Sequence, residues 1–241
     1  MFKKMICIIL SIVFCIAISG CDKHNDNNNN NIESNEPSLD DMLTSASVGD
    51  TIVFGKFDID EETAGKEDLE WIVLEKKNNK LFVMSKYIVS RQRNSAPDDS
   101  FNYSWAKSDV RKWLHDEFAE NAFDKESYQK ILTTRVYNYK YNTLNDIEQD
   151  PTEDKIFLPA VSELVKYGMG TRGIGIHEQE KSRVAYLYNS STPSTWFLRD
   201  TTEPEDGLCW VQETGRIIVH SAGGPDSDYG IGVRPVMWIE I

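Results

Sequence analysis

The chain has 241 residues, of which 40% are hydrophobic and 11% aromatic, and its formal net charge at pH 7 is −13. The length fits one large domain or two small ones, and the aromatic content excludes a chain that is disordered throughout. The negative charge argues against a nucleic-acid-binding protein, because such a protein needs a basic face to neutralise phosphates. We therefore expect a globular protein with no nucleic-acid partner.

The chain opens with the pattern of a signal peptide. Two lysines precede an almost unbroken apolar run at residues 5–18, which is too short for a normal membrane span. The run ends in Ile-Ser-Gly-Cys at residues 18–21, which resembles the bacterial lipobox, in which the cysteine becomes diacylated after cleavage. Two acyl chains give stable membrane attachment. We predict that residues 1–20 are removed and that lipidated Cys21 holds the chain at the extracytoplasmic face of the cell membrane.

The remaining cysteines support no disulfide after this processing. Cys7 and Cys15 leave with the signal peptide and Cys21 carries the lipid, so Cys209 is the one thiol left in the mature chain. Cys209 lies in an apolar segment. We therefore predict that it is a small buried hydrophobic residue rather than a reactive thiol.

A tether follows the lipid site. Residues 22–47 are rich in Asn, Asp, Glu and Ser, with five consecutive asparagines at 27–31. This composition has too little apolar surface to offset the entropy lost on ordering. We predict that residues 21–47, including the lipidated cysteine, form a disordered tether, with at most a helical turn at 40–43, and that residues 48–241 form the globular domain.

The globular part is predicted to begin with three strands. Residues 51–57, 70–75 and 81–85 are rich in β-branched and aromatic residues, and two asparagines at 78–79 are typical of a tight turn. Because the three segments follow each other closely, we predict that they form an antiparallel meander.

The middle of the chain is predicted to be helical. Val110, Trp113, Leu114 and Phe118 repeat at helical spacing. We predict a helix that contains these residues and is capped by Ser104 or Ser108, followed by a second helix over 124–132. A strand over 134–139, a polar loop over 141–154 and a short strand over 156–158 are predicted next. The last predicted elements of this part are a helix that is capped by Ser162 and runs to Tyr167, and a helical segment over 178–188.

The rest of the chain is predicted to consist of strands at 194–199, 208–212, 216–220 and 232–239. The second and third of these flank Glu-Thr-Gly at 213–215, which is a hairpin signal. Strands thus flank a helical middle. We predict an α+β fold: a single compact domain with one mainly antiparallel sheet.

Several segments form a series with a recognisable order: Val-Gly-Asp at 48–50, Gly-Lys-Phe at 55–57, Glu-Trp-Ile-Val-Leu at 70–74, Ser-Trp at 104–105, Val-Arg-Lys-Trp-Leu at 110–114, Ile-Phe-Leu-Pro-Ala-Val-Ser-Glu at 156–163, Trp-Phe-Leu-Arg at 196–199 and Val-Arg-Pro-Val-Met-Trp at 233–238. The series resembles DUF6273, a family of bacterial exported proteins and lipoproteins with no assigned function. The last two segments also resemble the C-type-lectin-like superfamily, including formylglycine-generating-enzyme-like domains. The resemblance implies a C-type-lectin-like fold, which hosts binders more often than enzymes.

No catalytic constellation can be assigned from the sequence. A formylglycine-generating enzyme needs paired cysteines, and the mature chain has a single one in its body. His115, His177 and His220 are scattered, without the spacing of a metal site. We assign no catalytic residue and no metal ligand. Calcium is the one cofactor kept as an alternative, because the acidic turns at 203–206 and 226–228 have some of the character of a lectin calcium site.

Most candidate binding residues lie in the last third of the chain. Trp105, Trp196 and Trp210 are the aromatic candidates, since aromatic rings stack on sugars and anchor interfaces, with a structural role as the alternative for each. Arg199 and Arg234 lie in apolar strands, where an arginine is expected to pair with a carboxylate or to cap carbonyls, with a ligand contact as the alternative. The predicted binding residues are Trp196, Arg199, Glu205, Asp206, Trp210, Asp226 and Asp228.

These features predict a lipid-anchored, extracytoplasmic and non-catalytic binding module. Its partners are the membrane, through the lipid, and a protein or a cell-envelope glycan that is read by the loops between Asp200 and Asp228. One alternative is an extracytoplasmic enzyme acting on envelope polymers, with His177 or His220 beside an Asp or Glu partner. Another alternative is a purely structural envelope protein.

Overall fold

The computed structural model describes residues 37–59, 65–93, 104–141, 147–170, 179–201, 207–219 and 230–241. The chain divides into two units, Met1–Glu36 and Pro37–Ile241, and all described residues belong to the second unit. The predicted signal peptide, the predicted lipidation site Cys21 and the predicted tether as far as residue 36 therefore lie outside the described residues. Within the described ranges, no helix is both long enough and apolar enough to cross a membrane.

The folded unit begins earlier than the sequence predicts. Helix α1 (Leu39–Ser45) starts after Ser38, whose hydroxyl accepts a hydrogen bond from a backbone N–H of the first turn (3.2 Å). Leu43 of this helix is fully buried, and the Lys76 ammonium donates hydrogen bonds to two carbonyls at the helix end (2.6 and 2.9 Å). Residues 37–47 therefore belong to the fold and not to the tether.

The first sheet contains, in spatial order, β1 (Thr51–Phe57), β2 (Glu67–Lys77), β3 (Lys80–Ser85), β14 (Val236–Glu240) and β7 (Ile156–Phe157). All of its pairs are antiparallel, which confirms the predicted meander of the first three strands. Asn78 and Asn79 form the β2–β3 turn with φ angles of 49° and 58°, the left-handed conformation that asparagine tolerates. Strand β14 lies between β3 and β7, so the sheet joins segments that are distant in sequence.

The second sheet contains, in spatial order, β12 (Ile217–Ile218), β11 (Leu208–Val211), β10 (Trp196–Thr201), β13 (Ile231–Val233) and β4 (Ser90–Gln92). A hairpin of β5 (Thr134–Lys140) and β6 (Ile147–Asp154) attaches to it where β5 meets β10. The β10–β13 and β10–β5 pairs are parallel and the others are antiparallel. The predicted α+β class with mainly antiparallel strands is confirmed, but the strands form two larger sheets, with a small β8 (Ala185–Tyr186) and β9 (Pro193–Ser194) ribbon, instead of one.

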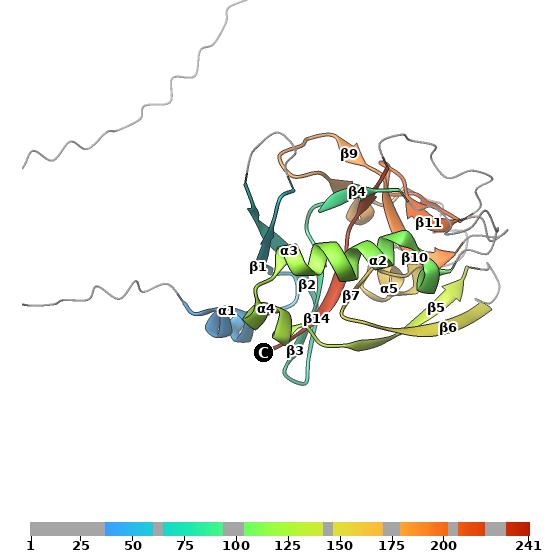
Figure 1. The fold of residues 1–241 in the computed structure, drawn as a ribbon. Coiled ribbons are helices and arrows are strands. Elements are labelled where there is room, and N and C mark those ends of the chain that lie inside the picture. Colours follow the sequence, from blue (N-terminus) through green and yellow to red (C-terminus); the bar gives the residue numbers. More distant parts are fainter. Residues whose placement is uncertain are drawn as a thin grey trace, which may run out of the picture. The chain divides into compact units, whose positions relative to one another are not determined.

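A helical segment passes from one sheet to the other: η1 (Trp105–Lys107), α2 (Asp109–Trp113), the π-helical turn η2 (Leu114–Phe118) and α3 (Ala119–Ala122). In Figure 1 it crosses the strands from the β1 end to the β10 end. Val110, Leu114 and Phe118 are fully buried, as their helical spacing predicts. Ser108 is the cap of α2, because its hydroxyl accepts a hydrogen bond from the Arg111 N–H (3.1 Å). The segment thus places η1 beside the β5–β6 hairpin.

Two predicted elements are wrong. The predicted loop at 141–154 contains strand β6, whose residues are polar because much of the strand is exposed and, among the described strands, it pairs with β5 alone. The described part of the predicted helix at 178–188 forms only the turn η4 (Lys181–Arg183) and then β8. There the buried Arg183 side chain donates to the carbonyls of Met169 (2.8 Å) and Gly215 (3.2 Å), and these tertiary bonds override helix propensity.

The two remaining α-helices of the described chain are α4 (Lys125–Lys130) and α5 (Val161–Lys166). The sequence predicts Ser162 as the cap of α5, but the structure places this residue inside the helix. Instead, the Glu163 carboxylate accepts the Ala160 N–H (2.8 Å) and the Asp200 carboxylate of β10 accepts the Val161 N–H (2.6 Å). A residue of strand β10 therefore accepts a backbone N–H of the first helical turn, and residue spacing near the helix does not reveal this tertiary contact.

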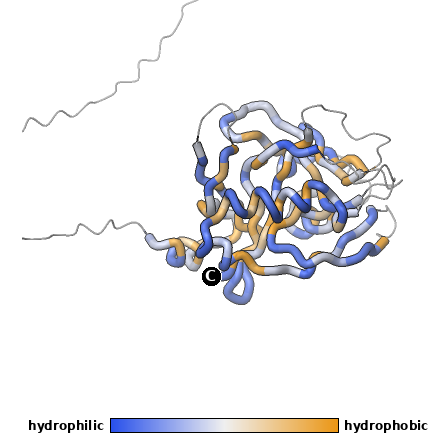
Figure 2. Tube along the Cα trace, viewed as in Figure 1, coloured by the Kyte–Doolittle hydropathy of each residue, from blue (hydrophilic) through white to orange (hydrophobic). Residues whose placement is uncertain are grey.

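Apolar segments gather in the central strands, whereas the β2–β3 turn is strongly hydrophilic (Figure 2). Trp71 is fully buried, and its indole N–H donates to the Phe54 carbonyl (2.7 Å). Cys209 is also fully buried, which confirms that it is a small core residue. Burial of these residues anchors both sheets in a common core.

Candidate functional site

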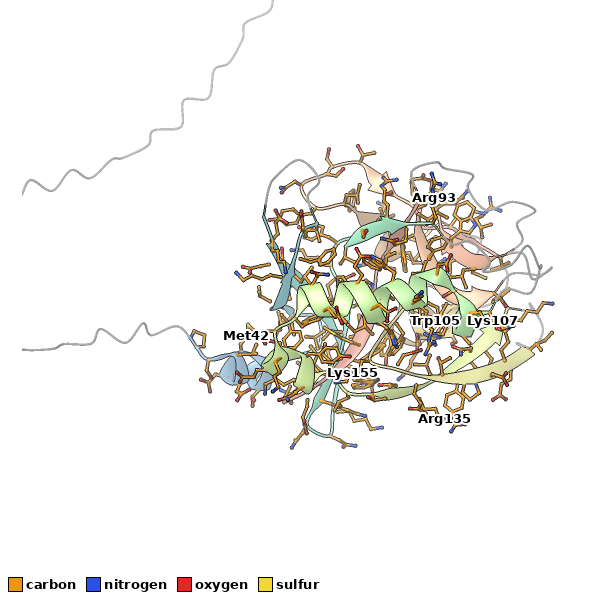
Figure 3. All side chains as sticks on the ribbon, in the orientation of Figure 1. Met42, Arg93, Trp105, Lys107, Arg135 and Lys155 are labelled. Atoms are coloured by element: carbon orange, nitrogen blue, oxygen red, sulfur yellow. The ribbon has the colours of Figure 1, made fainter. Side chains whose placement is uncertain are left out.

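A cavity of about 630 Å³ opens between η1 and the β5–β6 hairpin, and we call it the η1 cavity. Its volume lies within the range of small-molecule sites. Figure 3 shows Trp105 and Lys107 at the end of the helical segment that lies beside the hairpin. The described residues that line the η1 cavity are mostly polar: Ser104, Ala106, Lys107, Asn138, Glu148, Gln149, Asp150 and Pro151.

Asn138 of β5 is a buried amide at the wall of this cavity, with 1% of its surface exposed. Its Nδ2 donates to the Asp150 carbonyl (2.8 Å) and to the Thr152 hydroxyl (3.3 Å), which fixes the orientation of the amide. Its Oδ1 accepts no hydrogen bond within the described part of the chain. An unsatisfied buried acceptor costs about 1–3 kcal/mol, so the site gains when a donor reaches it.

Asp154 does not line the η1 cavity, but it accepts hydrogen bonds from two of the elements that form its walls, η1 and β6. Its Oδ2 accepts the Trp105 indole N–H from η1 (2.8 Å) and the Thr152 hydroxyl from β6 (2.6 Å). Its Oδ1 accepts the Arg111 Nε–H (2.8 Å) and forms an ion pair with the Arg111 Nη2 (2.7 Å). The Thr152 hydroxyl also accepts from Asn138, so a continuous hydrogen-bond network connects Asp154 to the cavity wall.

This network keeps the Asp154 carboxylate ionised. Burial by itself raises the pKa of the carboxyl group, but its contacts with His115, Arg111, Thr152 and Trp105 outweigh burial. Together they hold the pKa of Asp154 well below its usual range. The site therefore contains a buried carboxylate charge that is compensated by Arg111.

His115 lies beside this carboxylate in the π-helical turn, a type of turn that is frequent at functional sites. Its Nε2 is 3.1 Å from Asp154 Oδ1, but the two groups are not aligned for a hydrogen bond. Arg111, Trp105 and Thr152 donate the hydrogen bonds that this carboxylate accepts within the described chain. His115 is not among the described residues that line the η1 cavity.

A second cavity, of about 410 Å³, lies between β1 and the α3–α4 connection. Five of the described residues that line it are charged, and two of these, Lys56 of β1 and Asp68 of β2, form an ion pair (2.9 Å). The Lys66 ammonium donates to the Asn121 carbonyl (2.6 Å). These three of the five charged groups in this lining thus have partners within the protein, and the η1 cavity, which has an unsatisfied buried acceptor in its wall, is the better candidate site.

The described residues among the predicted binding residues do not form one surface. Trp196 is fully buried, and its indole N–H donates to the Arg183 carbonyl (2.9 Å), so it has no free ring face for a ligand. Arg199 is 3% exposed and meets the Glu163 carboxylate through both of its terminal nitrogens (3.1 and 3.2 Å). It also donates to the Leu158 carbonyl, so its contacts are those of the structural alternative.

Trp210 is half-buried in β11, between its partners in β10 and β12. Trp105 is fully buried and serves the network behind the η1 cavity. Arg234 is buried, donates to the Ser85 carbonyl (2.9 Å) and lies over the Trp196 ring (5.2 Å). Burial lowers the pKa of its guanidinium to about 10.

The other predicted residues lie outside the described residues: Cys21, His177, Glu205, Asp206, His220, Asp226 and Asp228. Among the residues that the structure does describe, no group of three or more His, Cys, Asp or Glu side chains is placed to hold a metal ion. The carboxylates considered for calcium are therefore not tested by this geometry.

Sequence reasoning missed Asn138, Thr152 and Asp154. The last two fall in the segment predicted to be a loop. Residues two apart in a strand share one face, so Thr152 and Asp154 point to the same side once β6 is recognised. One signal was available in the sequence: Asn138 is polar, although it lies two residues after Val136 and therefore on the same buried face of the predicted strand.

Comparison with protein-family models matches residues 78–241 to one described as a domain of unknown function, DUF6273. The matched range includes the η1 cavity and the whole Asp154 network, whereas β1 and β2 precede it. Searches of curated proteins and of solved structures found no match to this chain.

Proposed function

This chain belongs to the DUF6273 family, and we propose that it is a lipid-anchored, extracytoplasmic bacterial protein that binds a cell-envelope glycan without catalysing a reaction. The observation that carries the proposal is the η1 cavity, a concave site with a polar lining and an unsatisfied buried acceptor on Asn138. A binding site needs such a concave surface with a few fixed polar groups. A distant relationship to the C-type-lectin-like superfamily, in which binders are common, is part of the same proposal.

The cavity chemistry favours a glycan over a protein partner. Protein interfaces have an apolar, aromatic-rich centre. The described lining of the η1 cavity contains amide, carboxylate, hydroxyl and ammonium groups, with Ala106 and Pro151 as its apolar members. These groups match sugar hydroxyls, which both donate and accept hydrogen bonds.

An enzyme is the second candidate function: His177 and His220, on which the sequence bases it, lie outside the described residues, and the described His115 lies 3.1 Å from Asp154. A catalytic histidine needs a carboxylate that orients it through a hydrogen bond and a position that reaches the substrate. His115 has neither the aligned hydrogen bond nor a place in the described cavity lining. If the protein shortens a bound polymer over time and His115→Gln does not, the result would favour the enzyme.

The membrane attachment rests on the apolar run at 5–18 and on the Ile-Ser-Gly-Cys motif. We expect the full chain expressed in a bacterium to incorporate labelled palmitate and to enter the detergent phase on phase separation, because two acyl chains anchor it. Cys21→Ser is expected to lose both properties. Cys15→Ser, which changes a cysteine within the predicted signal peptide, is the matched control and is expected to keep both. Palmitate incorporation by Cys21→Ser would contradict the anchor.

The binding function is tested with the full chain in detergent on an array of envelope glycans, followed by calorimetric titration of the best ligand. We expect saturable binding that Ala106→Phe abolishes, because a phenyl ring at this position fills the η1 cavity. Thr44→Phe, which places the same ring at an exposed position of α1, is expected to bind normally. A chain that captures only a protein partner supports the protein alternative, and a chain with no ligand supports the structural one. Either result would contradict glycan binding.

A further inference from the structure

We propose that the η1 cavity selects an amino sugar, a polyhydroxylated ring that carries a free ammonium group. This inference rests on the proposed glycan-binding function and specifies the class of glycan. It depends on three properties of the described lining: its charge, its free acceptor and the absence of an aromatic side chain among the described lining residues.

The charge of the described lining is negative. Glu148 and Asp150 contribute two carboxylates, and Lys107 contributes one ammonium group. The Asp154 carboxylate behind the wall is paired with the Arg111 guanidinium, so this neutral pair neither adds to the excess nor cancels it. A ligand with a carboxylate or phosphate meets net repulsion here, whereas an ammonium group meets attraction. The site therefore discriminates against anionic sugars.

The free hydrogen-bonding capacity of the wall is that of an acceptor. Both hydrogens of the Asn138 amide point to partners in β6, the Asp150 carbonyl and the Thr152 hydroxyl. Its Oδ1 accepts no hydrogen bond within the described chain, and the carboxylates of Glu148 and Asp150 are acceptors only. The complementary ligand is rich in donors, as a ring with hydroxyl and ammonium groups is.

The third property excludes other cationic ligands. Among the described residues that line the cavity, none is aromatic. Methylated ammonium groups and aromatic cations are recognised through aromatic rings, whereas a primary ammonium group is recognised through charge-assisted hydrogen bonds. A polar, acceptor-rich cavity of about 630 Å³ thus fits a hydrated saccharide better than an apolar or a methylated cation.

The test compares two tetrasaccharides of equal length in calorimetric titrations of the full chain in detergent: β-1,4-linked glucosamine with free amines, and its fully N-acetylated form. We expect the free-amine tetramer to bind at least about 10-fold more tightly, because hydrogen bonds between an ammonium group and a carboxylate are stronger than those between neutral groups. Raising the salt concentration is expected to reduce this difference. Glucosamine monomer in a third arm identifies the source: equal affinity indicates a free amino sugar, and weaker affinity indicates a polymer.

Two variants that each remove one carboxylate charge test whether Asp150 and Glu148 cause the preference for the free-amine tetramer. Asp150→Asn and Glu148→Gln are expected to remove most of the 10-fold difference while leaving the N-acetylated tetramer nearly unaffected. Glu153→Gln changes an exposed carboxylate of the same strand outside the described cavity lining, and it is expected to keep the difference. Asn138→Ala is expected to weaken both tetramers. All three carboxylates are exposed, so these variants are expected to fold even if Asn138→Ala does not.

The inference and the proposed function fail in different ways. Equal binding of the two tetramers, tighter binding of the N-acetylated form, or a preference that Glu153→Gln removes would overturn the inference and leave glycan binding in place. Binding of an array glycan that has no amine, with no binding of either tetramer, would also overturn the inference alone. No binding of any glycan would overturn both.

Discussion

Replacing Asp154 with alanine is expected to lower the free energy of unfolding by about 3–5 kcal/mol, the usual cost of leaving one partner of a buried charge pair without the other. The variant leaves the Arg111 guanidinium without its carboxylate, and it removes the acceptor of the Trp105 indole N–H and of the Thr152 hydroxyl. Urea unfolding followed by tryptophan fluorescence measures the effect. Glu153→Ala, at an exposed position of the same strand, is the control and is expected to stay within about 0.5 kcal/mol of the wild type.

The same carboxylate makes stability depend on pH in a defined direction. The pKa of Asp154 is lowered in the folded chain, whereas in the unfolded chain it is about 3.9. Below about pH 4 the unfolded state therefore binds a proton that the native state does not bind, and stability falls as the pH falls. Asp154→Asn is expected to be less stable than the wild type at pH 7 and to lose less stability between about pH 4 and pH 2. An unchanged acid dependence in this variant would contradict the role of Asp154.

The second large effect is expected at the contact between α5 and β10. Glu163→Ala leaves the Arg199 guanidinium, 3% exposed, with backbone carbonyls as its described partners, and it removes the acceptor of the Ala160 N–H. We expect a loss of about 3–5 kcal/mol in the free energy of unfolding, because a buried charge without its counter-charge is strongly destabilising. Thermal and urea unfolding of the full chain measure this loss.

A double-mutant cycle separates the ion pair from the helix cap. Arg199→Met replaces the cation with an apolar chain, so Glu163→Ala together with Arg199→Met is expected to cost less than the sum of the two single changes, by about 1–3 kcal/mol. Ser162→Ala, which changes the preceding residue of α5, serves as the control and should have little effect. Additive losses would mean that Glu163 acts through the helix cap and not through Arg199.

Much of the fold could be predicted because its strands are apolar and β-branched. The β1–β2–β3 meander and the hairpin of β11 and β12 follow from local sequence patterns and their turns. Division into two sheets could not be predicted, since it depends on β10 pairing in parallel with β13 and with β5. These pairings join distant segments and leave no local signal. The polar composition of residues 37–47 predicts a tether, whereas buried Leu43 and the hydrogen bonds from Lys76 hold α1 on the core.

Less of the site could be predicted. The sequence identified tryptophans and arginines as unusual, but Trp196 and Arg199 are satisfied by contacts inside the protein. The residues that the structure brings together, Asn138 and Asp154, come from a strand and from a segment that resembles a loop in composition. Their proximity arises from the pairing of β5 with β6 and from the position of η1. Neither is encoded by residue spacing along the chain.

The central place of β14 has a kinetic consequence. Its partner β3 ends at residue 85, whereas β14 begins at residue 236, so the middle of the first sheet closes only when two segments separated by most of the domain meet. Folds dominated by such distant contacts reach the native state in about milliseconds to seconds, more slowly than helical bundles. Until β14 arrives, the edge of β3 is unpaired and available for pairing with another chain. Aggregation during refolding is therefore expected to compete with closure of this sheet, and it should decrease when the chain is diluted.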